Sequence, residues 1–75
     1  MEPYKQRMII EYRELEERYV KLEAMLAKYA AGTLDFTPSC SFQLLNTQLS
    51  IMGAYLNILE ERARIEGVDL NDTGN

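Results

Sequence analysis

The sequence predicts an all-α fold, a two-helix antiparallel hairpin that assembles into a helical homo-oligomer. Two long segments, residues 4–30 and about 42–65, carry apolar side chains at the three- and four-residue spacing of an amphipathic helix. Between them, residues 32–38 are the only stretch that does not suit a helix, because they contain a glycine and a proline. A chain of 75 residues buries only about 60% of the surface that it exposes when unfolded. We therefore expect a hairpin of this size to need a partner.

The first helix should span about residues 3–31. Pro3 suits the first helical position because its missing N–H has no partner there, and Gly32 can adopt the left-handed conformation that closes a helix. Seven residues spaced alternately by four and three form an apolar stripe along one face. They are Met8, Tyr12, Leu15, Tyr19, Leu22, Leu26 and Tyr29. The opposite face is rich in Glu, Lys and Arg, so it should lie in water.

The second helix should span about residues 40–66. Ser39 or Cys40 is the expected N-cap, although Thr37 followed by Pro38 at the first helical position suits nearly as well. Six residues, again spaced by four and three, form the stripe that faces the first helix. They are Leu45, Leu49, Met52, Leu56, Leu59 and Ala63.

The chain beyond the second helix loses this periodicity. We expect one helical domain, residues 1–67, followed by a frayed C-terminal tail, residues 68–75, in which only Val68 and Leu70 could dock.

A second apolar row lies about 100° around the second helix from its stripe, at a strict seven-residue interval. We call it the outer row, and it consists of Leu44, Ile51, Ile58 and Ile65. One partner helix does not cover both rows, so the outer row needs another surface, which a second copy of the chain would supply. In the middle of this helix Gly53, beside Ala54, costs about 1 kcal/mol of helix propensity relative to alanine. Such a cost suggests close packing or ligand access.

The composition argues against catalysis, metal binding and cofactor chemistry. The chain has no histidine and a single cysteine, Cys40. A nucleophilic serine or cysteine would lack its usual base, and a zinc site would have to use carboxylates and one thiolate. One cysteine forms no intramolecular disulfide, and the four glycines are too scattered for a phosphate-binding loop. We expect no catalytic residue, no metal site and no cofactor.

Charge and hydropathy exclude two further classes of partner. A formal net charge of −4 argues against a general nucleic-acid binder, which needs a basic face. No segment approaches the roughly 18 uninterrupted apolar residues of a transmembrane helix, and no apolar run follows a basic N-terminus. We expect a cytoplasmic protein that associates with itself and not with nucleic acid or membrane. Any anionic ligand must be held by a local cluster of side chains.

A set of polar and aromatic residues, which we call the polar row, runs beside the apolar stripes. The polar row consists of Tyr4, Arg7 and Glu11 on the first helix and Gln48, Tyr55 and Arg62 on the second. These residue types suit a nucleotide, because Arg binds phosphate, Tyr stacks on a base, and Gln or Glu forms hydrogen bonds to base or ribose edges. The plainer alternative is that the tyrosines flank an interface and that Arg7/Glu11 and Arg62/Glu66 are ordinary i,i+4 pairs. The pattern alone favours this alternative.

Three stretches together resemble a known family. They are Tyr4-Lys5-x-Arg7-Met8-Ile9-x-Glu11-Tyr12-x-x-Leu15, Lys21-Leu22, and Leu44-Leu45-x-x-Gln48-x-x-x-Met52-x-x-Tyr55-x-x-x-Leu59-Glu60-x-Arg62. Over residues 4–66 the chain resembles a family of short helical proteins of gut phages and prophages that is related to a crAss-like phage protein. Members often have proline at the position of Ser41. The chain therefore departs from the family pattern where the loop enters the second helix.

The hairpin is also similar in architecture to the phage anti-CBASS and anti-Thoeris proteins, small helical oligomers that sequester immune signals without cleaving them. This similarity implies a phage-encoded, non-catalytic protein in the host cytoplasm that binds a cyclic dinucleotide or a cyclic ADP-ribose derivative and inhibits anti-phage defence. Binding would occur between copies, because a two-helix hairpin encloses no cavity of ligand size. The alternative is a structural or adaptor oligomer that binds another phage or host protein through the outer row.

Overall fold

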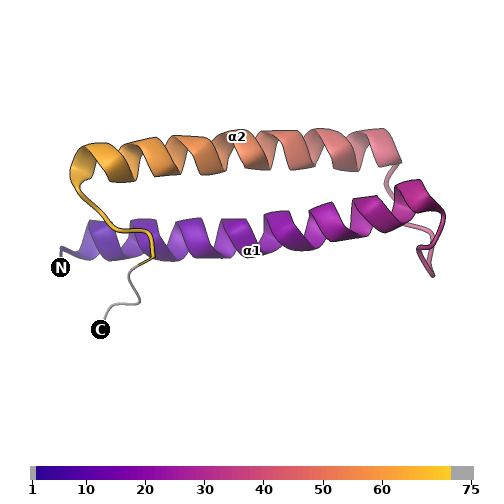
Figure 1. Ribbon diagram of the computed structural model, residues 1–75, viewed down its shortest axis with the longest axis horizontal. Coiled ribbons are helices and arrows are strands. Elements are labelled where there is room, and N and C mark those ends of the chain that lie inside the picture. The colour runs from indigo at the N-terminus through magenta and orange to yellow at the C-terminus, as the bar shows by residue number, and fades with distance from the viewer. Residues whose placement is uncertain (1, 72–75) are drawn as a thin grey trace.

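Two antiparallel helices make up the protein, as a computed structural model that describes residues 2–71 shows (Figure 1). Helix α1 spans Pro3–Ala31, helix α2 spans Phe42–Glu66, and residues 32–41 connect them. The helices pack side by side in a body of 45 × 22 × 17 Å. The expected all-α hairpin is confirmed. The structure describes one copy of the chain, so the homo-oligomer stays a prediction.

Helix α1 begins and ends where the sequence predicts. Pro3 occupies the first helical position, and Gly32 closes the helix in the left-handed conformation with φ 73°. The Gly32 N–H donates to the Tyr29 carbonyl at 3.1 Å, and the Thr33 N–H donates to the Lys28 carbonyl at 2.9 Å. These two bonds form a Schellman motif, which satisfies carbonyls at the end of the helix.

Helix α2 begins two residues later than expected, and its N-cap is Ser41. The Ser41 hydroxyl accepts a hydrogen bond from the Leu44 N–H at 3.1 Å, the usual bond of an N-cap serine. A start at Phe42 also places that ring against Tyr29 at the end of α1, with ring centroids 5.3 Å apart. The N-caps expected from the sequence are therefore wrong. They were Ser39, Cys40 and Thr37.

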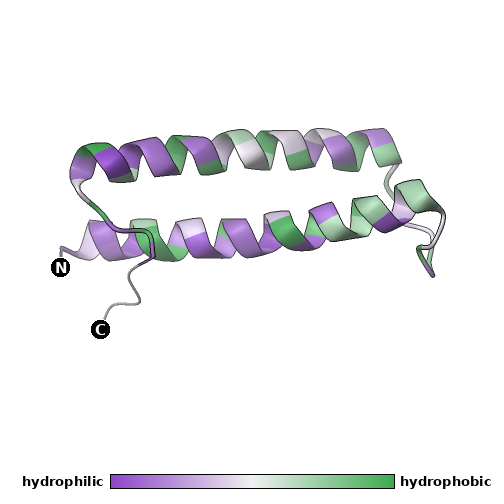
Figure 2. Ribbon diagram, in the orientation of Figure 1, coloured by the Kyte–Doolittle hydropathy of each residue, from purple (hydrophilic) through white to green (hydrophobic). Residues whose placement is uncertain are grey.

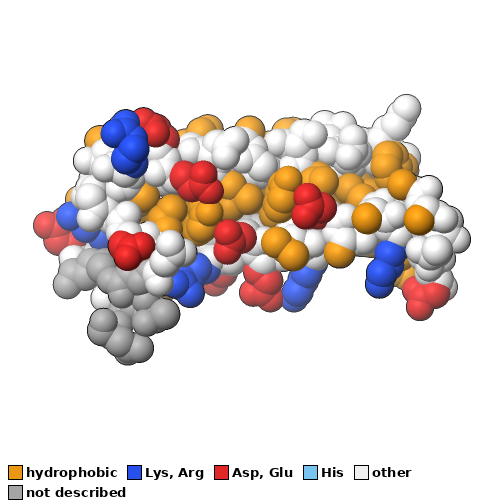
Figure 3. Space-filling view, viewed as in Figure 1, with side chains coloured by type: hydrophobic (Ala, Val, Ile, Leu, Met, Phe, Trp, Pro, Cys, Tyr) orange, Lys and Arg blue, Asp and Glu red, His pale blue; other side chains and the backbone are white. Residues whose placement is uncertain are grey.

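The two predicted stripes meet along one line, which we call the seam, and every residue in them is buried or half-buried. Leu59 is fully buried, and Leu26, Leu56 and Ala63 are almost so. Figure 2 shows hydrophobic segments recurring along both helices, and Figure 3 shows hydrophobic side chains gathered where the helices meet. The periodicity thus predicted the core of the hairpin correctly.

Gly53 makes room for an aromatic ring inside the hairpin. A Cβ atom at this position would lie 3.3 Å from Cε2 of Tyr19, tighter than an ordinary van der Waals contact. Gly53 therefore costs helix propensity, but it allows α1 to pack closely on α2. The ring of Tyr19, from the same chain, occupies the flat surface at Gly53.

The segment after α2 turns back over the start of α1 (Figure 1). The Val68 N–H donates to the Ala63 carbonyl at 2.8 Å, and Val68 is buried. It completes a small apolar cluster with Met8, Ile9, Ala63 and Leu70. Val68 and Leu70, the two residues of the expected tail that could dock, therefore do so. Residues 72–75, the rest of the expected tail, lie outside the described residues.

Residues 2–71 contain no candidate membrane span and no candidate metal site. No helix there has an apolar stretch long enough to cross a membrane. No group of three or more His, Cys, Asp or Glu side chains in the same residues is placed to hold a metal ion.

Candidate ligand-binding site

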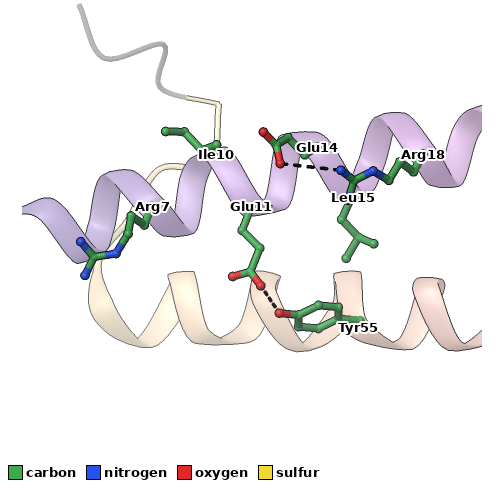
Figure 4. A pocket seen from close by; sticks show the side chains of 7 residues that line it. All are labelled: Arg7, Ile10, Glu11, Glu14, Leu15, Arg18 and Tyr55. Carbon is green, nitrogen blue, oxygen red and sulfur yellow. Dashed lines mark hydrogen bonds and ion pairs between the residues drawn. The ribbon is translucent and has the colours of Figure 1, made fainter.

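Antiparallel packing places polar-row residues of both helices on one side of the seam, which we call the polar flank. The Tyr55 hydroxyl of α2 donates a hydrogen bond to the Glu11 carboxylate of α1 (Figure 4). Nearer the end of the hairpin, Tyr4 of α1 lies close to Glu66 of α2, and Arg62 also pairs with Glu66. The polar row is therefore continuous across the two helices at this end.

The other side of the seam is closed by a different pair. The Tyr12 hydroxyl donates to the Glu60 carboxylate at 2.7 Å. This bond raises the pKa of Tyr12 well above its ordinary value, so the phenol remains a donor. The sequence places Tyr12 in the stripe, but the bond itself depends on how α1 and α2 align, which periodicity does not give.

An open groove of about 500 Å³ lies on the polar flank. Its lining residues are Arg7, Ile10, Glu11, Glu14, Leu15, Arg18 and Tyr55. Figure 4 shows that Glu11 and Leu15 point toward α2, whereas Ile10 points away from it. Three members of the polar row, Arg7, Glu11 and Tyr55, thus line one groove.

The other three members lie outside this groove. Tyr4 and Arg62 lie near Glu66, toward the end of the hairpin. Gln48 is exposed and comes seven residues before Tyr55, which on a helix is about 10.5 Å along the axis. In one chain, therefore, only Arg7, Glu11 and Tyr55 of the six residues line this groove.

Two charged lining residues, Glu14 and Arg18, are absent from the predicted site. They continue the spacing of Tyr4, Arg7 and Glu11 by three and then four residues, so extending the row along the sequence would have included them. Their own ion pair is loose, with the nearest atoms 4.0 Å apart.

The arginines of the polar flank are weakly held. Arg62 approaches Glu66 only to 4.0 Å, and within residues 2–71 Arg7 forms no ion pair. Of the two pairs in the plainer alternative, Arg62/Glu66 is present and Arg7/Glu11 is not, because Glu11 bonds to Tyr55 instead. Both guanidinium groups can therefore turn to an anion at little cost.

The two tyrosines of the polar flank are protonated donors at neutral pH. The hydrogen bond to Glu11 raises the pKa of Tyr55 above its ordinary value, with burial as the next cause. Burial raises the pKa of Tyr4, and Glu2 adds to the effect. Tyr55 is 38% exposed and Tyr4 43%, so part of each ring remains accessible to a planar ligand.

A further groove, of about 510 Å³, lies at the other end of the hairpin and was not predicted. Its lining residues are Lys21, Ala24, Met25, Lys28, Thr33, Leu34, Asp35 and Phe36. The nitrogen of Lys21 is engaged by Glu17 at 2.8 Å. This groove lacks the arginine and tyrosine combination of the polar flank.

Comparison with known proteins places the chain in a family. The chain matches the family model described as Sequestin over residues 2–65, which covers α1 and nearly all of α2. No curated protein and no solved structure matches the chain. Because the matched range is most of the 75 residues, this protein belongs to the Sequestin family.

Proposed function

We propose that this protein is a non-catalytic binding protein that sequesters a nucleotide-type immune signal, a cyclic dinucleotide or a cyclic ADP-ribose derivative. It is encoded by a phage and acts in the host cytoplasm, where it inhibits anti-phage defence by lowering the concentration of free signal. Membership in the Sequestin family carries the general part of this proposal, since the family name denotes sequestration. The polar flank supports the choice of a phosphate-bearing ligand.

The arginines of the polar flank bind the phosphates. A guanidinium group presents a planar fork of donors that matches a phosphate, and each charge-assisted hydrogen bond is worth about 1.5–3 kcal/mol. Arg62 gives up a pair with Glu66 that is worth only about 0–1 kcal/mol. The exchange of carboxylate for phosphate is therefore favourable at Arg62. At Arg7 no ion pair within residues 2–71 has to be broken.

The remaining members of the polar row orient the ligand. Tyr4 and Tyr55 stack on the bases, which contributes about 1–3 kcal/mol for each base. Glu11 and Gln48 accept or donate hydrogen bonds at base and ribose edges. Glu11 is held in place by the Tyr55 hydroxyl, so this carboxylate is positioned before the ligand arrives.

Binding takes place between copies of the chain. Known ligand pockets usually bury about 70–90% of the surface of a small ligand, whereas the groove of one chain is open. The outer row supports association, because each of its four residues is more than half exposed in the described part of the chain. A second copy closes the groove.

Sequestration predicts stoichiometric capture and release of unchanged ligand. The protein at micromolar concentration is mixed with each member of a panel of cyclic dinucleotides and cyclic ADP-ribose isomers. Free ligand is measured by filtration and chromatography, before and after heat denaturation. We expect one class of ligand to disappear from the filtrate and to return intact on heating. A ligand that returns modified indicates an enzyme, and a panel from which nothing is retained overturns the proposal.

The exposed outer row favours one second candidate, a structural or adaptor oligomer that binds another phage or host protein. In that case the panel shows no retention, and a helical partner covers the outer row. The same experiment therefore separates the two functions.

A further inference from the structure

The outer row and the polar row interleave on a single face of α2. Counting along the helix, the two rows alternate at spacings of four and three residues from Leu44 to Ile65. The apolar members are 58%, 64%, 55% and 68% exposed, in the order Leu44, Ile51, Ile58 and Ile65. A strict seven-residue repeat of this length on an exposed face is the pattern by which one helix pairs with another. The face is distinct from the seam, which α1 already covers.

The same face is symmetric about its own middle. The outer row is centred between residues 54 and 55, and the polar residues of α2 are centred on Tyr55. Two copies of α2 that run antiparallel about a twofold axis at this point bring each row opposite itself in reverse order. Leu44 then faces Ile65, Ile51 faces Ile58, and Gln48 faces Arg62.

Parallel pairing of two α2 helices is less favourable than antiparallel pairing. It would bring the two Arg62 side chains together, and like charges in contact disfavour association. In the antiparallel arrangement each Arg62 meets a neutral Gln48. Ala54, a small and exposed residue, lies next to the axis and lets the two helices approach closely.

The order of the rows around α2 decides the shape of the pair. Tyr55 reaches Glu11 across the seam, so the polar row lies between the seam and the outer row. Contact through the outer rows therefore leaves both polar rows on the same side of the pair. The α1 helices form the walls of this trough, and Arg7 of each copy lies along a wall.

We propose that two copies of the chain pair through α2 in this antiparallel register, and that the trough between them is one ligand site to which both copies contribute. This inference rests on the proposed function and gives it a geometry. The site has two Arg7, two Arg62 and two Tyr55 side chains related by a twofold axis. It suits a cyclic nucleotide that carries two phosphates and binds as one ligand for two chains.

The register is tested by cysteine cross-linking. Cys40 is free and exposed, so Cys40→Ser provides the background. Ile51→Cys and Ile58→Cys are made separately in that background, with different tags. Both positions are exposed in one chain, so neither substitution affects the hairpin core. On oxidation, the mixture of the two variants should give a covalent dimer that neither variant gives alone.

Each other outcome overturns the register. Dimers formed by either variant alone indicate parallel pairing, and the absence of any dimer indicates that the outer rows do not meet. Gln43→Cys is the matched control, because Gln43 is exposed on α2 but belongs to neither row. It should give no specific dimer.

Ligand stoichiometry tests the shared site on the cross-linked dimer. Isothermal titration with a cyclic dinucleotide and, separately, with a cyclic ADP-ribose isomer should give one ligand bound for two chains in one of the two titrations. One ligand for each chain overturns the shared site. If the cross-link forms as predicted but neither compound binds, the proposed function and the shared site are overturned and the α2 contact stands. Binding without the predicted cross-link overturns the contact and leaves sequestration in place.

Discussion

Replacing Arg7 or Arg62 by alanine should separate ligand binding from folding. Arg62 and Glu66 are 4.0 Å apart, with side chains 54% and 29% exposed, and such pairs are worth about 0–1 kcal/mol. Arg7 forms no ion pair within residues 2–71. Either substitution should therefore lower the free energy of unfolding by less than about 1 kcal/mol. For a chain of this size that moves Tm by less than about 8 °C.

The same substitutions should weaken ligand binding far more. Losing one charge-assisted hydrogen bond to phosphate costs about 1.5–3 kcal/mol, which raises Kd roughly ten- to more than a hundredfold. Isothermal titration calorimetry measures Kd, and circular dichroism melting of the same samples measures Tm. Tyr55→Leu extends the test to stacking, because leucine keeps the apolar bulk and removes the aromatic face.

Arg64→Ala is the matched control for Arg62→Ala. Arg64 is on the same helix, forms an ion pair with Glu61, and is 70% exposed. Positions two residues apart lie about 200° apart around a helix, so Arg64 is directed away from the polar flank. Its loss should leave Kd unchanged. Equal effects of the Arg62 and Arg64 substitutions, or wild-type affinity in the Arg7 and Arg62 variants, would refute the assignment of phosphate contacts.

The outer row, the N-cap of α2 and the bond that closes the seam each give a further prediction. Ile51→Glu should dissociate the oligomer, because burial of each such side chain is worth up to roughly 1.5–3 kcal/mol and a carboxylate there has no partner. Wild-type protein that sediments as a monomer at micromolar concentration contradicts this prediction. Ser41→Ala should lower the free energy of unfolding by about 0.5–2 kcal/mol, whereas Ser39→Ala should not, and equal denaturant midpoints for the two variants would show that Ser41 is not the cap. Because the hydrogen bond to Glu60 raises the pKa of Tyr12 above its ordinary value of 10.0, this bond contributes stability below pH 10.0 that is lost as the phenol ionises at higher pH. The Tm difference between wild type and Tyr12→Phe should therefore shrink as the pH rises above 10.0, and a constant difference speaks against the linkage.

The helices and their inner faces could be predicted because the signals for them are local. A stripe such as Leu45 to Ala63 depends only on spacing along one helix, and glycine at position 32 supplies the backbone conformation that ends α1. The start of α2 is different, because Thr37, Ser39 and Ser41 all suit a cap. The start at Ser41 is accompanied by packing of Phe42 on Tyr29. This contact joins the two helices, so local sequence signals do not contain it.

Contacts between distant segments explain the other errors. Ile9 lies outside the predicted stripe, yet it is buried because Val68 returns over it. Spacing within the polar row could be predicted from the sequence, but the alignment of α1 with α2 could not. That alignment, seen in the bond from Tyr55 to Glu11, decides which members share a groove. Gln48 consequently lies apart in one chain although its spacing matches that of its neighbours.

Interleaving of the two rows on α2 links assembly to ligand binding. A ligand held by both copies stabilises the pair by mass action, about 2.7 kcal/mol at a concentration one hundred times Kd. Ile51→Glu should then abolish capture although residue 51 belongs to the outer row and contacts no ligand, whereas Arg62→Ala should lose ligand and keep the pair. An adaptor gives a different pair of results, because Ile51→Glu loses the protein partner and Arg62→Ala loses nothing. The two functions therefore differ in the response of a single helix face to two substitutions three turns apart.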